Sequence, residues 1–153
     1  NLDLKKTKQS ITKRTKAIMP VDFNGRAVDI KNITELANQH NLSLIEDAAH
    51  GLGCFYDKKH VGTMSDIGIF SFSTPKIITT GQGGMIVTNN KKLYEKCKAL
   101  KDFGRKSGAK RNMHTAFEHP TIGYNFKFTE FQAAIGISQM KKLPKRIIKK
   151  KKM

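Results

Sequence analysis

A strand, a helix and a second strand follow one another between residues 15 and 45, and this order constrains the fold more than any other feature of the chain. The short apolar stretch Thr15–Val21 predicts the first strand. Apolar residues recur with helical spacing in Val28–His40, where Asp29 is suited to cap the helix, and Leu42–Ile45 predicts the second strand. The default for such a unit is parallel strands with a right-handed crossover. The sequence therefore predicts an α/β fold with a mostly parallel sheet flanked by helices.

The remaining apolar patterns predict two more strands and two more helices. Both strands are expected to be buried, because their residues are largely β-branched, aromatic or otherwise apolar. The predicted strands are Ile67–Phe72 and Met85–Val87, and the predicted helices are Lys91–Asp102 and the segment that Thr129 caps. The other segments are expected to be a short helix or connector at Asn1–Arg14, a loop at Gly51–Gly62 and an irregular surface loop at Phe103–Pro120.

One lysine, Lys76, stands in the loop between the two later strands. Pro75 ends the strand before it, and two threonines and three glycines separate it from the next strand. A lysine in an enclosed site loses its proton readily and serves as an amine nucleophile that forms a Schiff base with an aldehyde. A solvated loop lysine is the plainer alternative.

Two titratable residues, Asp47 and His50, follow the second predicted strand. Ligands of open α/β sheets gather at the carboxyl ends of strands, and the loop with Lys76 also follows a strand end. Taken singly, Asp47 is more often a turn residue and His50 a hydrogen-bonded loop histidine, and Ser71 by itself is a strand serine bonded to backbone. The occurrence of Asp47 and His50 together with Lys76 favours a shared ligand site.

Three motifs of the chain resemble those of one enzyme family. They are Ser71-Phe72-x-x-x-Lys76-x-x-Thr79-Thr80-Gly81-x-Gly83-Gly84, Glu46-Asp47-Ala48-Ala49-His50, and Gly123-Tyr124-Asn125 followed by Thr129 and Ala133-Ala134. Together they resemble the DegT-like sugar aminotransferases, and among these the perosamine-synthase-like members. The resemblance implies the large domain of a fold-type-I transferase that uses pyridoxal 5′-phosphate (PLP).

The resemblance also implies a role for each matching residue. Lys76 would hold the PLP aldehyde as the internal aldimine and later carry protons, and Asp47 would keep the pyridine nitrogen protonated. His50 would lie beside the ring hydroxyl, and Ser71 would bind the phosphate. Asn125 would reach across a homodimer interface to the phosphate in the partner's site.

The implied reaction moves an amino group from an amino acid donor such as glutamate to a nucleotide-linked keto-deoxysugar, as in polysaccharide biosynthesis. A related branch dehydrates the sugar and has histidine at the lysine position, so Lys76 argues against it. A non-catalytic regulatory relative remains a second alternative. The sequence departs from the family at Lys127, where arginine is usual, and at Gln82, where glutamate is common.

The family resemblance covers nearly the whole chain but only the middle of the family's enzyme. We therefore expect residues 1–153 to be a partial PLP-binding large domain. The earlier segment of the family and its smaller C-terminal domain would be absent. Such a fragment is expected to be inactive alone.

The net charge of +17 raises a third alternative, a basic nucleic-acid-binding module. The basic residues are scattered, however, and no nucleic-acid-binding motif accompanies them, so this alternative ranks lowest. No apolar run is long enough to cross a membrane, and the histidines show no metal-ligand spacing. Cys54 and Cys97 form no CxxC pair and are expected to be reduced thiols, which favours the cytoplasm.

Overall fold

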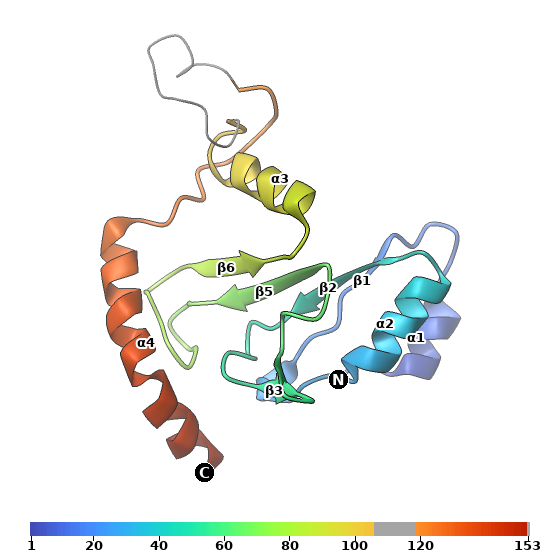
Figure 1. Cartoon of the computed structure of the whole chain (residues 1–153), viewed down its shortest axis with the longest axis horizontal. Coiled ribbons are helices and arrows are strands. Elements are labelled where there is room, and N and C mark those ends of the chain that lie inside the picture. The colour runs from blue at the N-terminus through green and yellow to red at the C-terminus, as the bar shows by residue number, and fades with distance from the viewer. Residues whose placement is uncertain (106–118, 153) are drawn as a thin grey trace.

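The computed structural model describes residues 1–105 and 119–152 and contains a sheet with the strand order β1-β2-β5-β6 (Figure 1). Its strands are β1 (Ala17–Ile18), β2 (Ser43–Asp47), β5 (Ile67–Ser71) and β6 (Gly84–Val87). The first three strands of this order are parallel, and β6 pairs with β5 in the antiparallel direction. The predicted α/β fold with a mostly parallel sheet is thus confirmed.

Helix α2 (Ile30–Gln39) connects β1 to β2, as the sequence predicts. The Asp29 carboxylate accepts a hydrogen bond from the backbone N–H of Asn32 and caps the helix. One face of α2 packs against the sheet and forms the first apolar cluster, made of Ile18, Val28, Ile30, Ile33, Leu36, Ala37 and Leu44. The short helix α1 (Leu4–Ser10) adds apolar side chains to the same cluster.

The first strand is shorter than the predicted Thr15–Val21. Ordinary strand pairing ends at Ile18, and Pro20 has no N–H to donate to a neighbouring strand. The chain nevertheless stays beside β2, because the N–H of Asp47 donates to the Pro20 carbonyl at 2.9 Å. An isolated bridge joins Val21 to Asp47, so the residues after β1 run along the carboxyl end of β2.

The segment Gly51–Gly62, expected to be a loop, contains a small hairpin of β3 (Phe55–Tyr56) and β4 (Lys59–His60). The two residues between these strands, Asp57 and Lys58, both have positive φ, which is typical of a type I′ hairpin turn. Because neither is glycine, the usual sequence signal of this turn is missing.

A second apolar cluster lies between the hairpin and β5, with the buried members Ala48, Val61, Phe70, Phe72 and Ile78. The backbones of two glycines meet here, since a Cβ added to Gly68 would lie 1.7 Å from the Gly62 carbonyl oxygen. Only glycine fits at position 68. This contact brings the hairpin segment close against β5 and supports the strand that leads to Lys76.

The strand β6 differs from its prediction. The sequence predicts that it is buried, but Met85 is 51% exposed and Ile86 is 53% exposed. The reason is that, among the described residues, β6 is the last strand of the sheet and pairs only with β5. Apolar composition predicted the strand correctly but carries no information about its place at the edge.

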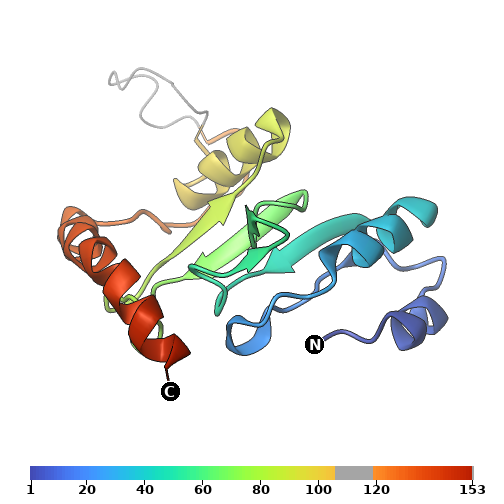
Figure 2. The same ribbon diagram turned by 60° about the horizontal axis from the view of Figure 1, so that its bottom comes forward.

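In the second half of the chain, the described residues form the helices α3 (Lys91–Lys101) and α4 (Glu130–Lys151), and both were predicted. Thr129 caps α4 through a capping box with Gln132. Figures 1 and 2 both place α1 and α2 at one end of the molecule and α4 at the other, beside the end of β5.

Most of the loop predicted at Phe103–Pro120 lies outside the described residues. Over residues 1–105 and 119–152, no helix has the length and apolar character that crossing a membrane requires.

Candidate active site

A cavity of about 700 Å³ opens where β2 and β5 end. Three of the five predicted site residues line it together, namely His50, Ser71 and Lys76. The other lining residues are Asn24, Gly25, Ala49, Leu52, Gly53, Cys54, Phe55, Pro75, Ile77, Ile147, Lys150 and Lys151. The chain thus brings together at one strand-end site residues that lie far apart in sequence, as expected for an α/β sheet.

Lys76 lies on the segment that we call the Lys76 loop, residues 73–83, between β5 and β6. Its backbone N–H donates to the Ser73 carbonyl at 3.1 Å, which forms a tight turn directly after the strand. Further along, the N–H of Thr80 donates back to the Phe72 carbonyl at 2.9 Å. These two bonds fold the loop back on itself and place the half-buried Lys76 side chain at the cavity wall.

His50 is held by the segment that follows β1. The backbone N–H of Asn24 donates to His50 Nδ1 at 3.3 Å, and the ring of Phe23 lies 5.6 Å from the imidazole, centre to centre. Because Nδ1 accepts a hydrogen bond, the proton of the neutral ring lies on Nε2. His50 can therefore present an N–H donor to a ligand in the cavity.

Asp47 is the last residue of β2, three positions before His50. Its Oδ1 accepts from the N–H of Ala49 at 3.0 Å, and its backbone carbonyl accepts from Asp22 at 3.0 Å. Asp47 is half-buried and does not line the cavity itself, although Ala49 does. The structure thus places the predicted carboxylate at the strand end, next to the cavity wall.

Ser71 closes β5, and its hydroxyl lies 3.1 Å from the hydroxyl of Ser73. The backbone N–H of Ser73 also approaches the Ser71 oxygen at 3.4 Å. A serine hydroxyl backed by a second hydroxyl and by a turn is a suitable group to bind a phosphate oxygen. The sequence indicated Ser71 but not the contribution of Ser73.

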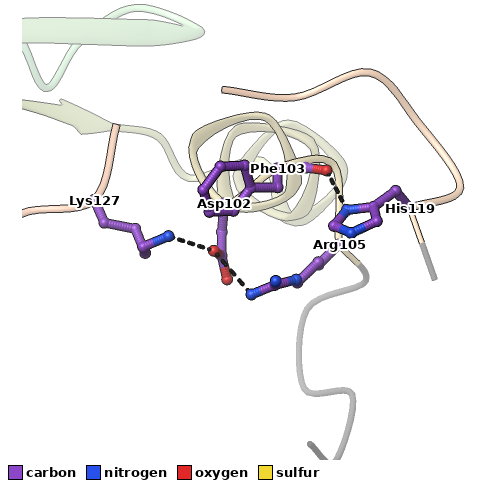
Figure 3. A network of polar contacts seen from close by, with 5 residues as sticks. All are labelled: Asp102, Phe103, Arg105, His119 and Lys127. Atoms are coloured by element: carbon purple, nitrogen blue, oxygen red, sulfur yellow. Dashed lines mark hydrogen bonds and ion pairs between the residues drawn. The ribbon is translucent and has the colours of Figure 1, made fainter. Parts of the chain in front are cut away.

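Asn125, the fifth predicted residue, does not line the cavity. It lies beside the C-terminal end of α3, where it forms an isolated backbone bridge with Asp102. Nearby, Lys127 Nζ contacts Asp102 Oδ1 at 3.1 Å and lies over the ring of Phe103, while Arg105 approaches the same carboxylate (Figure 3). Within one copy of the described chain, Asn125 is therefore separate from the group around Lys76.

Two buried carboxyl groups, Asp22 and Glu46, lie behind this site, and the side chains of both are fully buried. Asp22 Oδ1 accepts from the N–H of Val28 at 3.0 Å, and the two carboxyl groups bond to one another. Loss of hydration on burial raises the pKa of Asp22 and of Glu46. Raised pKa values favour a protonated carboxyl group in this pair, which joins the segment after β1 to β2.

The cavity wall is basic and has no carboxylate among its lining residues. Besides Lys76, it includes Lys150 and Lys151 from the last turn of α4. The sequence showed these two only as part of a basic run at the end of the chain, and no local pattern linked them to Lys76. A cavity with an amine, a histidine, a hydroxyl and excess positive charge suits an anionic ligand that carries an aldehyde and a phosphate. The residues present therefore fit PLP.

Relatives with assigned activities share most of this chain. It is 43% identical over 145 residues to the GDP-perosamine synthase of Escherichia coli O157:H7, an overlap of 95% of this chain and 38% of that protein. It is 39% identical over 144 residues to a UDP-4-amino-4,6-dideoxy-N-acetyl-beta-L-altrosamine transaminase of Helicobacter pylori, covering 94% of this chain and 37% of that one. The chain thus spans well under half the length of these relatives.

Solved structures share the fold at similar identity. Helicobacter pylori PseC, an aminotransferase of pseudaminic acid biosynthesis, superposes with a TM-score of 0.85 at 39% identity, covering 94% of this chain and 38% of that one. An E. coli GDP-4-keto-6-deoxy-D-mannose-3-dehydratase with bound hydrated PLP superposes with a TM-score of 0.83 at 30% identity, covering 94% and 40%. The architecture is that of the fold-type-I PLP enzymes. The model of the DegT/DnrJ/EryC1/StrS aminotransferase family matches residues 1–153, and the chain belongs to this family.

Proposed function

We propose that the protein containing this chain is a PLP-dependent aminotransferase that acts on a nucleotide-linked keto-deoxysugar. The observation that carries the proposal is that Lys76, His50 and Ser71 line one basic cavity at the carboxyl ends of β2 and β5. The amino group would come from an amino acid such as glutamate. The names of the relatives, a perosamine synthase and an altrosamine transaminase, support a nucleotide sugar as the acceptor.

PLP, when bound, supplies an electron-accepting ring that stabilises negative charge on the carbon bonded to the transferred nitrogen. Lys76 Nζ would hold the cofactor covalently and, once released, would move a proton between the carbon atoms of donor and cofactor. The Asp47 carboxylate would hold a proton on the pyridine nitrogen. His50 Nε2 would donate to the ring hydroxyl, and the Ser71 hydroxyl would donate to the phosphate.

We also propose that the protein acts as a homodimer in which Asn125 reaches the partner's site. Asn125 lies away from the cavity of its own chain, and the residues around it expose apolar side chains, as interfaces do. Ile122 is 83% exposed, Phe126 is 69% exposed and Phe131 is 84% exposed.

We further propose that the protein is located in the cytoplasm. The two free cysteines support this location, because thiols stay reduced there.

The first test is chemical and concerns the lysine alone. The purified protein is mixed with PLP, its absorbance is recorded before and after borohydride reduction, and the reduced label is located by peptide mass mapping. We expect a visible band that reduction removes, with the label on Lys76. Lys76→Ala should lose the fast, selective labelling and leave only slow label on other amines such as Lys150 and Lys151, whereas Lys92→Ala, a change at an exposed lysine of α3, should keep the label on Lys76. Circular dichroism confirms that each variant is folded.

The second test separates the aminotransferase from its rivals in the protein that contains this chain. Glutamate and GDP-4-keto-6-deoxymannose serve as probes, and the sugar product is identified by mass spectrometry. An amino sugar supports the proposal, whereas a sugar that has lost a hydroxyl supports a dehydratase. Labelling of Lys76 without any turnover of donor or sugar would point to the regulatory alternative.

The nucleic-acid alternative requires at least that binding of DNA or RNA weakens steeply as the salt concentration rises. An affinity for DNA or RNA that does not change with salt would dismiss it.

A further inference from the structure

One face of α4 lies along the Lys76 loop. Gln132 Nε2 donates to the backbone carbonyl of Gln82 at 2.8 Å, and the hydroxyl of Thr80 donates to the same oxygen at 2.7 Å. One turn further along the helix, a Cβ added to Gly136 would lie 3.2 Å from the methyl group of Thr80. The first part of α4 thus holds the end of the loop that leads into β6.

The last part of α4 reaches the other end of the loop through Arg146. Its Nη1 donates to the carbonyl of Ile77 at 2.8 Å and also to Gln139 Oε1 at 2.7 Å. Both bonds are partly buried, and Gln139 lies two turns earlier on the same helix. The side chain of Gln139 therefore fixes the direction of the guanidinium toward the loop.

The carbonyl that Arg146 binds belongs to the residue directly after Lys76. On the other side of Lys76, its own N–H donates to the Ser73 carbonyl at 3.1 Å. Ile78, the next residue, is buried in the second apolar cluster. The backbone is therefore fixed both before and after Lys76, and the bond from Arg146 is the charge-assisted one.

We propose that Arg146 is a positioning residue that sets where the amine of Lys76 lies in the cavity. The proposal rests on the proposed function, in which Lys76 Nζ binds the cofactor. Arg146 does not line the cavity and acts only through the Ile77 carbonyl. A nucleophile that is displaced by about 1 Å loses up to about a hundredfold in rate, so loosening this one contact is expected to have a measurable effect.

The cavity itself supplies an internal reporter of this position. Lys150 and Lys151 line the same cavity as Lys76 and are competing amines. While Lys76 is held correctly, PLP should label it selectively. When the loop is displaced, the label should spread to the two lysines of α4. The ratio of label between Lys76 and these two residues therefore reports the position of the loop and does not depend on turnover.

The experiment compares Arg146→Met with Lys145→Met in the purified protein. Both changes remove one positive charge from adjacent positions of α4, but Lys145 is exposed. Each variant is mixed with PLP, trapped with borohydride at a series of times and pH values, and mapped by mass spectrometry. For Arg146→Met we expect labelling of Lys76 to be about tenfold to a hundredfold slower, with label appearing on Lys150 and Lys151. Lys145→Met should match the unmodified protein.

Two further variants keep the proposal testable if Arg146→Met folds poorly. Arg146→Lys keeps the charge but has no planar fork, so it should recover part of the selectivity. Gln139→Met keeps Arg146 and frees its guanidinium, so its labelling should be intermediate. Labelling of Arg146→Met, or of Gln139→Met, with the rate and distribution of Lys145→Met would overturn the positioning role. Failure of the unmodified protein to label Lys76 would instead overturn the proposed function itself, and this role with it.

Discussion

The two halves of the chain differ in how they bury apolar residues. Among the described residues, the buried hydrophobic side chains all lie between Ile18 and Ile78, in two clusters that flank the sheet. Helices α3 and α4 bury none, and several aromatic side chains between them are largely exposed. The first half therefore contains the buried core, although Met19, Phe23 and Phe55 remain exposed, whereas the second half carries apolar surface that one copy of this chain does not cover.

The site lies where these two halves meet. The first half supplies Lys76, His50 and Ser71, which rest on the buried clusters, and the second half adds the basic end of α4. The proposed nucleophile, Lys76, therefore belongs to the well-packed half. Lys150 and Lys151, whose charges would attract an anion, come from α4, a helix without buried residues.

The largest expected difference between the halves is in the cost of deleting an isoleucine. Ile33 is 1% exposed, so Ile33→Ala should lower the free energy of unfolding by about 2–5 kcal/mol. Ile137 on α4 is 63% exposed, and Ile137→Ala should change the free energy of unfolding by less than about 0.5 kcal/mol. Urea denaturation followed by circular dichroism measures both. Equal losses would mean that Ile137 is buried in the protein as purified, and light scattering would then show whether a second copy covers it.

The next contrast concerns two glutamates, buried Glu46 and exposed Glu130. Because the pKa of Glu46 is raised above its ordinary value of 4.5, folding favours its protonated form. The stabilisation that protonated Glu46 gives to the folded protein is fully present below pH 4.5. It is lost as the pH rises through the raised pKa of Glu46 in the folded protein. The amide of Glu46→Gln does not titrate in this pH range, and it can still donate a hydrogen bond to the Asp22 carboxylate.

The stability of Glu46→Gln relative to the unmodified protein should therefore increase from acidic to neutral pH. Thermal unfolding at a series of pH values measures this trend. Glu130→Gln, which removes the same charge from the first turn of α4, should change stability by less than about 0.5 kcal/mol. A relative stability of Glu46→Gln that is constant or falls with pH would show that Asp22 and Glu46 do not share a proton.

The smallest expected effect belongs to Lys127, which links the end of α3 to the segment before α4. Lys127→Met removes the contact of 3.1 Å with Asp102 and the charge above Phe103. The pair is partly exposed, so the loss should stay below about 1 kcal/mol and should shrink further in high salt. Denaturation at two salt concentrations tests it, with Lys145→Met as the matched loss of charge. If Lys127→Met lowered the free energy of unfolding by more than Ile33→Ala does, the second half would contribute more to stability than the first, contrary to the expectation.

Much of the site could be predicted from sequence, because local patterns encode it. The strand before Lys76, the turn residues after it and the strand before Asp47 each follow from the order of neighbouring residues. The same holds for the cap of α4 at Thr129. The family motifs added the roles of Ser71 and Asn125, of which the structure places only Ser71 at the cavity.

The rest depends on contacts between residues far apart in the chain. Asn24 and His50 are 26 positions apart, and Arg146 is 69 positions from the carbonyl that it binds. Nothing in either segment alone reveals its partner. The wrong prediction that β6 is buried has the same origin, since its apolar composition does not show that β5 is its only neighbour within the described part of the chain.

The distance between Arg146 and Ile77 in sequence also sets an order of events during synthesis. A ribosome adds about 5–20 residues per second, so roughly 3–14 s separate the two residues as the chain grows. During that interval the nascent chain already contains Lys76 but has no helix to hold the loop that carries it. Pyridoxal phosphate that meets the chain at this stage encounters an unguided amine. With Arg146 in the proposed positioning role, selective capture of the cofactor is expected only after translation has passed α4.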